Sequence, residues 1–190
     1  MLKIVSICGS LRKDSFNKML LEAIKQESKE VGDMEITIVE IDKLPLFNED
    51  LEIGGDPVEV IDFKEKLREA DGILIVTPEY NSGIPGGLKN ALDWASRPIQ
   101  SSIFANLPVA VAGATPGSIG TALSQMQLRQ ILVAMNANVM SGPKVLVGGV
   151  HQKVDSETKQ IIDQRTISHL RSFANQLKDF VMMYKKEKNK

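Results

Sequence analysis

Residues 2–17 read LKIVSICGSLRKDSFN and contain the pattern that decides the fold. The first seven residues are mostly apolar and β-branched, which is typical of a buried strand. Beyond the polar stretch 9–17, apolar residues recur at helical spacing from Met19 to Ile24. A strand, a polar loop and a helix therefore follow one another. Such a unit places hydroxyl groups and free backbone N–H groups at a helix N-terminus, which favours an anion.

The side chains of this first loop suit a phosphate group. Ser10, Ser15 and Asn17 can donate hydrogen bonds, and Arg12 adds a permanent charge with fork geometry. The loop matches neither G-x-G-x-x-G nor the P-loop pattern, because it has a single glycine and no Gly-Lys pair. We interpret it as a site for a mononucleotide held largely by side chains. The alternative is that Ser15 or Asp14 only caps the helix.

Strands and helices alternate along the whole chain. The expected strands span residues 2–8, 34–41, 72–77, 107–113 and 138–147, and the expected helices begin at residue 18 and span 57–70, 88–95, 125–136 and 156–184. We expect a loop at 48–56 and a frayed lysine-rich tail at 185–190. This alternation predicts an α/β fold of three layers, with a five-stranded parallel sheet in the order 2-1-3-4-5 between helices. Residues 1–190 are expected to form one domain.

Sheets of this kind bind ligands at the carboxyl ends of their strands, so the loops after strands 1, 3 and 4 should converge. The second of these loops, 78–87, has ten residues where two to six are usual. Its prolines and glycines make it stiff and allow close backbone approach, and Tyr80 supplies an aromatic face. The alternative is a tight connection in which Ser82 or Asn81 caps the next helix.

The third loop, 114–120, is rich in small and hydroxyl residues, and capping by Ser118 or Thr121 would explain much of it. Glu79 could transfer protons, but the sequence shows no partner histidine or second carboxylate near it. His151 and His169 are expected to be surface or packing residues.

The composition limits the class of protein. Hydrophobic residues make up 43% and charged residues 25%, and the net charge of −1 argues against a nucleic-acid surface. No apolar run approaches the roughly 20 residues of a membrane span. Cys8 is the only cysteine, which excludes an intrachain disulfide and is compatible with a reducing cytoplasm. The chain has only two histidines, so Cys8 is expected to be a core residue rather than a zinc ligand.

The stretches GSLRKDSFN, at 9–17, and PEYNSGIPGGLKNALDW, at 78–94, together resemble the NAD(P)H-dependent FMN reductase family of flavodoxin-like proteins. This family includes chromate reductases, quinone reductases and azoreductases. The stretches LPLFNEDLE and GATPGSIGT also lie where the family has similar segments, so the resemblance covers most of the chain.

The resemblance implies a set of FMN-binding residues. The phosphate and ribityl chain would be surrounded by Ser10, Arg12, Ser15, Phe16 and Asn17. The isoalloxazine ring would lie along Pro78, Glu79, Tyr80, Asn81 and Gly83. Thr115 and Gly117 would border the flavin. The helix that carries Leu88, Leu92 and Trp94 resembles the surface through which family members form homodimers or homotetramers, sometimes completing the site from a second subunit.

The implied activity is hydride transfer from NADPH or NADH through bound FMN to a small acceptor, such as a quinone, an azo compound, chromate or free flavin, in a ping-pong cycle. No side chain is expected to be catalytic, because the flavin carries the chemistry. Backbone N–H groups of residues 79–83 could stabilise negative charge on the reduced ring. One alternative is a flavodoxin-type electron carrier for protein partners, which the near-neutral charge disfavours. Another is a degenerate fold that binds a nucleotide or a regulatory partner without turnover.

Overall fold

The computed structural model describes residues 1–188 and contains one parallel sheet. Its strands are β1 (Leu2–Cys8), β2 (Met34–Val39), β3 (Gly72–Val76), β4 (Pro108–Ala114), β5 (Asn138–Val139) and β6 (Val145–Val147). Along the sheet they follow the order β2-β1-β3-β4-β5, and β6 also pairs with β4. The predicted order 2-1-3-4-5 is therefore confirmed.

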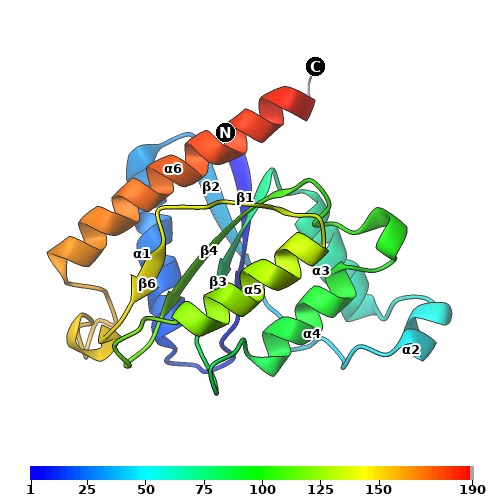
Figure 1. The fold of residues 1–190 in the computed structure, drawn as a ribbon, viewed down its shortest axis with the longest axis horizontal. Helices are drawn as coiled ribbons and strands as arrows, with labels where there is room; N and C mark the ends of the chain where they lie inside the picture. The colour runs from blue at the N-terminus through cyan, green and yellow to red at the C-terminus, as the bar shows by residue number, and fades with distance from the viewer. Residues whose placement is uncertain (189–190) are drawn as a thin grey trace.

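Helices cover both faces of this sheet, as predicted (Figure 1). The helices are α1 (Phe16–Val31), α2 (Glu49–Ile53), α3 (Val58–Arg68), α4 (Gly86–Ala95), α5 (Ala122–Ala134) and α6 (Gln164–Lys188). Two short 3-10 helices, η1 (Ile99–Ser101) and η2 (Val150–Gln152), lie in connections. Side chains of α1 and α6 share one core cluster, and side chains of α3, α4 and α5 share the other.

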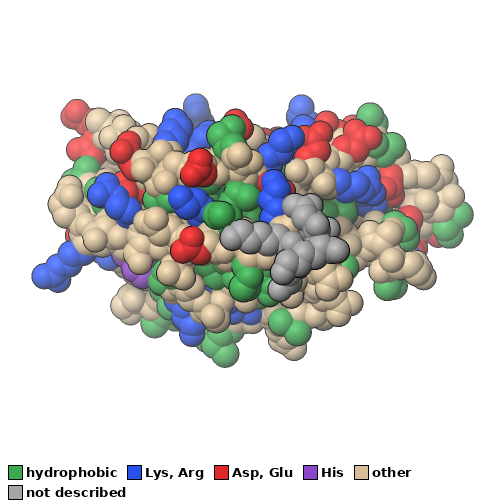
Figure 2. Space-filling view, turned by 90° about the horizontal axis from the view of Figure 1, so that it is seen from above, with side chains coloured by type: hydrophobic (Ala, Val, Ile, Leu, Met, Phe, Trp, Pro, Cys, Tyr) green, Lys and Arg blue, Asp and Glu red, His purple; other side chains and the backbone are tan. Residues whose placement is uncertain are grey.

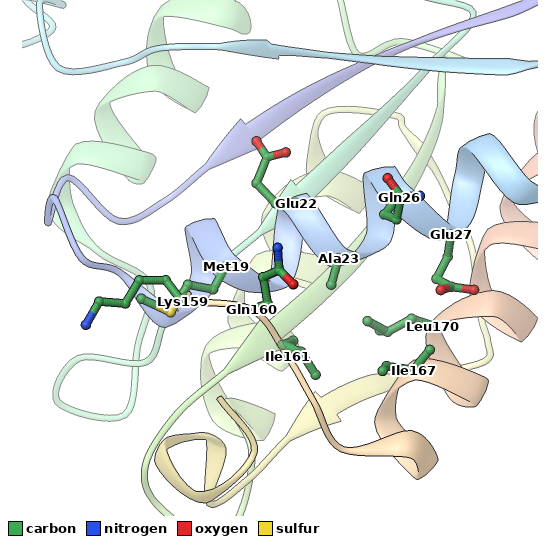
Figure 3. A pocket seen from close by; sticks show the side chains of 10 residues that line it. All are labelled: Met19, Glu22, Ala23, Gln26, Glu27, Lys159, Gln160, Ile161, Ile167 and Leu170. Carbon is green, nitrogen blue, oxygen red and sulfur yellow. The ribbon is translucent and has the colours of Figure 1, made fainter. Parts of the chain in front are cut away.

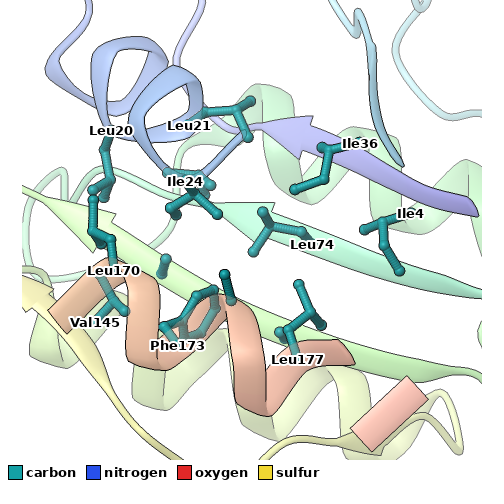
Figure 4. Packing of buried hydrophobic residues seen from close by; sticks show 14 of the residues in the cluster. Ile4, Leu20, Leu21, Ile24, Ile36, Leu74, Val145, Leu170, Phe173 and Leu177 are labelled. Carbon is teal, nitrogen blue, oxygen red and sulfur yellow. The ribbon is translucent and has the colours of Figure 1, made fainter. Parts of the chain in front are cut away.

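The two core clusters explain why the strand sequences are almost continuously apolar. Ile4 of β1 and Leu74 of β3 lie in one cluster with Leu20 of α1 and Phe173 of α6 (Figure 4). The neighbouring Val5 lies in the cluster on the opposite face of the sheet. Because both faces of β1 and β3 are buried, alternation between apolar and polar residues is suppressed there.

The predicted fifth strand, 138–147, is wrong in one respect: it is divided into β5 and β6, and both segments pair with β4. The interruption contains Pro143, which has no N–H group and cannot donate to the ladder. Arg129 of α5 donates from Nη1 to the backbone oxygen of Met140 at 2.7 Å, so this carbonyl is bonded outside the sheet. Burial of its guanidinium lowers the pKa of Arg129.

The expected loop at 48–56 contains the short helix α2, which was not predicted. Asn48 caps this helix, and its side chain accepts a hydrogen bond from the N–H of Asp50 at 3.0 Å. No residue of α2 is buried, so the helix shows no apolar periodicity. The other predicted elements are confirmed, apart from the final helix, with boundaries that shift by no more than three residues.

The final helix begins at Gln164, eight residues after the predicted start at 156. The preceding residues instead fold back on themselves through an antiparallel bridge between Val154 and Ile161. Helix α6 continues through Lys188, so the prediction that 185–188 is frayed is wrong; 189–190 lie outside the described residues. Lys185 donates to a carboxylate oxygen of Asp71 at 2.8 Å, which connects this end of α6 to the start of β3.

Charged side chains of both signs are mixed on the surface. On the face shown in Figure 2, Lys and Arg side chains alternate with Asp and Glu side chains and with hydrophobic patches. This distribution agrees with the net charge of −1. No helix among the described residues is long and apolar enough to cross a membrane.

Candidate functional site

The three predicted loops meet at the carboxyl edge of the sheet. Gly9, at the start of the first loop, packs so closely that a Cβ there would lie 3.4 Å from Pro78 of the second loop. The side chain of Asn17 bonds to Ala114, where the third loop begins. The backbone N–H of Thr77 donates to Ala112 of β4 at 2.9 Å. The expected convergence of the loops is therefore confirmed.

The first loop leads into α1 through a local cap. Ser15 is the N-cap residue, and its hydroxyl oxygen accepts a hydrogen bond from the N–H of Asn17 at 3.1 Å. Ser15 and Ser10 are both buried, and the first turn of α1 contains no acidic residue. The positive end of this 16-residue helix is thus not neutralised by a side chain of its own first turn. Capping and anion binding are compatible here, since the Ser15 hydroxyl can still donate its own hydrogen.

Arg12 lies over the same helix start. Its Nη2 donates to the backbone oxygen of Asp14 at 2.7 Å, and its guanidinium carbon is 5.9 Å from the centre of the Phe16 ring. These contacts hold an exposed permanent cation beside the buried hydroxyls of the loop.

Asn17 connects two loops, a role that was not predicted. Its Nδ2 donates to the backbone oxygen of Ala114 at 2.9 Å, and its Oδ1 accepts from the N–H of Ala114 at 2.9 Å. Both partners of this paired contact are buried. Asn17 therefore fixes the start of α1 to the end of β4, and its side-chain oxygen is already in use.

The second loop contains a tight turn from Tyr80 to Gly83. The N–H of each of these two residues donates to the carbonyl oxygen of the other at 3.0 Å. The central residues, Asn81 and Ser82, have φ of 49° and 63°, which is the conformation of a type I′ turn. Tyr80 is about half exposed beside this turn. Neither Asn81 nor Ser82 caps α4, whose N-cap is Pro85, so that alternative is wrong.

Glu79, just before this turn, caps α5. Its Oε2 accepts hydrogen bonds from the N–H groups of Leu123 at 2.9 Å and Ser124 at 3.0 Å. The N-cap residue of α5, Thr121, has a φ of 65° and makes no capping hydrogen bond with its side chain. The expected capping by Ser118 or Thr121 is therefore wrong, because a carboxylate from the second loop fills this role.

The third loop is bonded to the segment after β6. The N–H of Thr115 donates to Val147 at 3.0 Å, and the N–H of Val150 donates back to Thr115 at 3.2 Å. Gly117 accepts from Gly149 at 3.0 Å. Thr115 is half-buried and Gly117 is exposed. Both lie just after β4, at the carboxyl edge of the sheet. No sequence pattern indicated that residues 147–150 support this loop.

Three side chains of α4, the helix expected to form an intersubunit surface, are internal. Leu88, Leu92 and Trp94 of α4 are each no more than 1% exposed in the single chain. Leu88 and Leu92 pack in the core beneath α4, and Trp94 donates from Nε1 to the backbone oxygen of Pro45 at 2.8 Å. They stabilise the subunit itself, so the expected association through α4 would use the outer face of the helix.

Residues outside the loops behave as expected. Cys8 is buried at the end of β1, and desolvation raises the pKa of its thiol. His151 and His169 are both exposed. Nε2 of His169 lies 2.8 Å from the backbone oxygen of Lys144.

A cavity of about 490 Å³ lies apart from the three loops, between α1, α6 and residues 159–161 (Figure 3). None of the predicted site residues lines it. A smaller neighbouring cavity, of about 400 Å³, shares Met19 and Glu22 with it and reaches Ser15.

Comparison with known proteins decides the family. Residues 2–152 match the model of the NADPH-dependent FMN reductase family. The chain belongs to this family. It is 41% identical over 188 residues to a quinone reductase of Escherichia coli, with 97% of both chains covered. It is 40% identical over 172 residues to a 2-hydroxy-1,4-benzoquinone reductase of Burkholderia sp., covering 90% of this chain and 92% of that protein.

A solved structure supports the same assignment. The flavoenzyme FerB, an NAD(P)H:(acceptor) oxidoreductase from Paracoccus denitrificans, is similar with a TM-score of 0.88 and 32% identity, covering 97% of this chain and 99% of that one. An azoreductase from Bacillus anthracis has a TM-score of 0.67 at 16% identity, a likeness of fold alone. The expected fold, enzyme class and cofactors, FMN with NADPH or NADH, are therefore confirmed as those of an FMN reductase family member.

Proposed function

We propose that this FMN reductase family member binds FMN across its three loops and transfers hydride from NAD(P)H to a small acceptor in a ping-pong cycle. The observation that carries the proposal is the start of α1, where the loop that holds buried Ser10 and Ser15 and exposed Arg12 leads into a helix with no acidic residue in its first turn. Hydroxyl donors, a fork-shaped cation and a helix dipole form a donor set that fits a phosphate group.

The second and third loops would receive the ring of the cofactor. Tyr80 of the second loop offers an exposed aromatic ring, and Thr115 and Gly117 of the third loop would border the flavin. Among the described residues, the N–H groups of Tyr80 and Gly83 are used within the turn, whereas those of Glu79, Asn81 and Ser82 donate to no protein acceptor. The backbone groups that could stabilise negative charge on the reduced ring, expected among residues 79–83, are therefore the N–H groups of Glu79, Asn81 and Ser82.

Bound FMN supplies hydride acceptance and donation, and the protein supplies binding and orientation. Phe16 and Arg12 pack against each other at the start of α1, where they would flank the phosphate end of the cofactor. The turn 80–83 and the third loop would hold the flavin ring, on which a nicotinamide and then an acceptor would stack. A single open face would serve both substrates in turn. We infer a quinone as the acceptor, supported by the names of the E. coli and Burkholderia relatives.

The phosphate site is tested with the double variant Arg12→Ala, Ser15→Ala. We expect the dissociation constant for FMN to rise at least about 100-fold, because charge-assisted hydrogen bonds contribute about 1.5–3 kcal/mol each. The control is Arg68→Ala, Ser172→Ala, which removes the same residue types from exposed helix surfaces. Unchanged FMN affinity in the first variant would place the phosphate elsewhere.

The activity is tested by steady-state oxidation of NADPH and of NADH with benzoquinone. Parallel lines in double-reciprocal plots support the ping-pong cycle, and the ratio of the two kcat/KM values gives the preferred nucleotide. An electron carrier for protein partners would oxidise almost no NADPH with benzoquinone, and a degenerate fold would retain no FMN.

We further infer a homodimer or homotetramer that works in the cytoplasm. Support comes from exposed apolar side chains on and beside α2, where Leu46, Ile53 and Val58 are each more than 70% exposed. Helix α2 has no buried residue and is held by Arg97, whose Nε lies 2.7 Å from Glu52. Light scattering on the wild type and on Ile53→Lys, Val58→Lys tests this: a monomeric wild type contradicts it.

A further inference from the structure

We infer that Glu79 and Gln127 form a clamp that fixes the turn 80–83 to α5, and that Glu79 is a positioning residue for the flavin rather than an acid or base. The two residues are called the α5 clamp below. This inference rests on the proposed binding of FMN along the turn.

The first half of the clamp is the carboxylate of Glu79. It accepts two backbone hydrogen bonds at the start of α5, from Leu123 and Ser124, across 44 and 45 residues of sequence. The helix has no acidic residue in its own first turn, and its N-cap Thr121 makes no side-chain capping bond. Glu79 therefore provides both the acceptor and the negative charge that this helix start favours.

The second half of the clamp is Gln127, about one turn further along α5. Its Oε1 accepts a hydrogen bond from the N–H of Ile84 at 2.8 Å. A Cβ at Gly83 would lie only 2.8 Å from the same oxygen, so a side chain there would push the Gln127 oxygen from its present position. Helix α5 is thus bonded to the residue immediately before the turn, Glu79, and to the residue immediately after it, Ile84.

Helix α5 is itself anchored to the sheet. Nε2 of Gln125 donates to the backbone oxygen of Val145 in β6 at 2.8 Å and lies 3.1 Å from Oγ1 of Thr121. Thr121 is fully buried and packs against Gly113 of β4 so closely that a Cβ at Gly113 would overlap its Oγ1. The orientation of the turn is therefore set by β4 and β6 through α5.

Two substitutions separate positioning from proton transfer. Glu79→Gln removes the charge but keeps an oxygen that can accept both N–H groups, whereas Glu79→Ala removes the acceptor as well. A positioning role predicts that Gln restores part of what Ala loses. An acid or base role predicts that both variants lose kcat equally, by about 10²–10⁴-fold.

The experiment compares Glu79→Ala, Glu79→Gln and Gln127→Ala with the wild type, with Asp163→Ala as matched control. Asp163 is also an acidic cap, since it accepts from Thr166 at the start of α6, far along the chain from the loops. The measurements are the dissociation constant of the apoprotein for FMN, kcat and KM for NADPH at saturating FMN, and hydrogen exchange of the apoprotein.

We expect Glu79→Ala to weaken FMN binding by roughly 5- to 30-fold, the factor that loss of a helix cap implies. Glu79→Gln and Gln127→Ala should fall between this variant and the wild type, and Asp163→Ala should leave FMN affinity unchanged. In the apoprotein, exchange at Ile84, Leu123 and Ser124 should become faster in Glu79→Ala but not in Asp163→Ala.

Three outcomes would overturn the inference: wild-type FMN affinity and exchange in Glu79→Ala, equal losses of kcat in the Gln and Ala variants, or an equal loss of FMN affinity in Asp163→Ala. Failure of the proposed function is distinguishable. A wild type that binds no FMN rejects that function and the flavin role of the clamp, while apoprotein exchange still reports whether Glu79 and Gln127 fix the turn.

Discussion

Helices α5 and α6 begin in different ways. Helix α6 starts after its own Asp163, which accepts hydrogen bonds from the N–H and the hydroxyl of Thr166, both at 2.7 Å and three residues away. Helix α5 starts after a left-handed Thr121 that caps nothing, and Glu79 from another loop bonds to its free N–H groups. A local cap stabilises one helix. A remote cap also ties two loops together, and here both loops belong to the proposed flavin site.

Helix α1 combines the two arrangements. Ser15 caps it locally, whereas Asn17, two residues later, reaches Ala114 across 97 residues of sequence. If remote contacts hold the site together, breaking them should cost more than removing a local cap. The following substitutions test this difference, from the largest expected effect to the smallest.

Gly113→Ala should have the largest effect. A Cβ at Gly113 would overlap Oγ1 of Thr121 and the backbone oxygen of Thr77, neither of which can move without shifting α5 or β3. We expect the free energy of unfolding to fall by about 3 kcal/mol or more, measured by chemical denaturation. Gly86→Ala is the control, because a Cβ there meets no atom within 4 Å. Equal effects in the two variants would show that Thr121 is not tightly seated on β4.

Asn17→Ala should follow. It leaves the N–H and the carbonyl of Ala114 without partners in a buried place, and each lost partner costs about 1–3 kcal/mol. We expect a loss of about 2–4 kcal/mol in the free energy of unfolding. Asn175→Ala removes only a contact to Arg171 on the exposed side of α6, and should change stability by less than about 0.5 kcal/mol. A similarly small loss at Asn17 would contradict the proposed link between α1 and β4.

Ser15→Ala, the local cap of α1, should cost about 1 kcal/mol. The change leaves one N–H group, that of Asn17, without its acceptor, whereas Asn17→Ala removes the partners of two buried groups of Ala114. Denaturation of the apoprotein in phosphate-free buffer measures this effect without an anion at the helix start. A loss as large as that of Asn17→Ala would remove the distinction between local and remote contacts.

The same distinction explains what the sequence could predict. Apolar patterns identified every strand region and placed three loops at one edge, because burial on both faces of the sheet is a local signal along each strand. The split of 138–147 was missed although the sequence signals it, because Gly142 and Pro143 interrupt the apolar residues there. Helix α2 was not predicted because it has no buried face and depends on Arg97, which pairs with Glu49 and Glu52.

Within the site, the residue types were predictable and the partners were not. Ser15, as a possible cap, could be identified from its position before a helical pattern. Asn17, Glu79 and Gln127 have partners 97, 44 and 43 residues away, and no spacing or composition encodes these distances. These three side chains link the loops, so the connections that shape the site depend on tertiary structure.

Asp163→Asn should have the smallest effect, and that effect should depend on pH. The side-chain and backbone hydrogen bonds from Thr166 lower the pKa of Asp163 in the folded protein. A lowered folded pKa means that the carboxylate contributes stability above its unfolded pKa of about 3.9, and that this contribution is lost as pH falls through the folded pKa. Asparagine keeps the accepting oxygen but does not titrate.

The unfolding temperature of the wild type should therefore exceed that of Asp163→Asn by a constant small margin between about pH 5 and 7, and the margin should shrink below about pH 4. Thermal unfolding across this range measures it. A margin that persists unchanged at pH 3 would mean that the hydrogen-bonded charge of Asp163 does not stabilise α6, and the local cap would then depend on geometry alone.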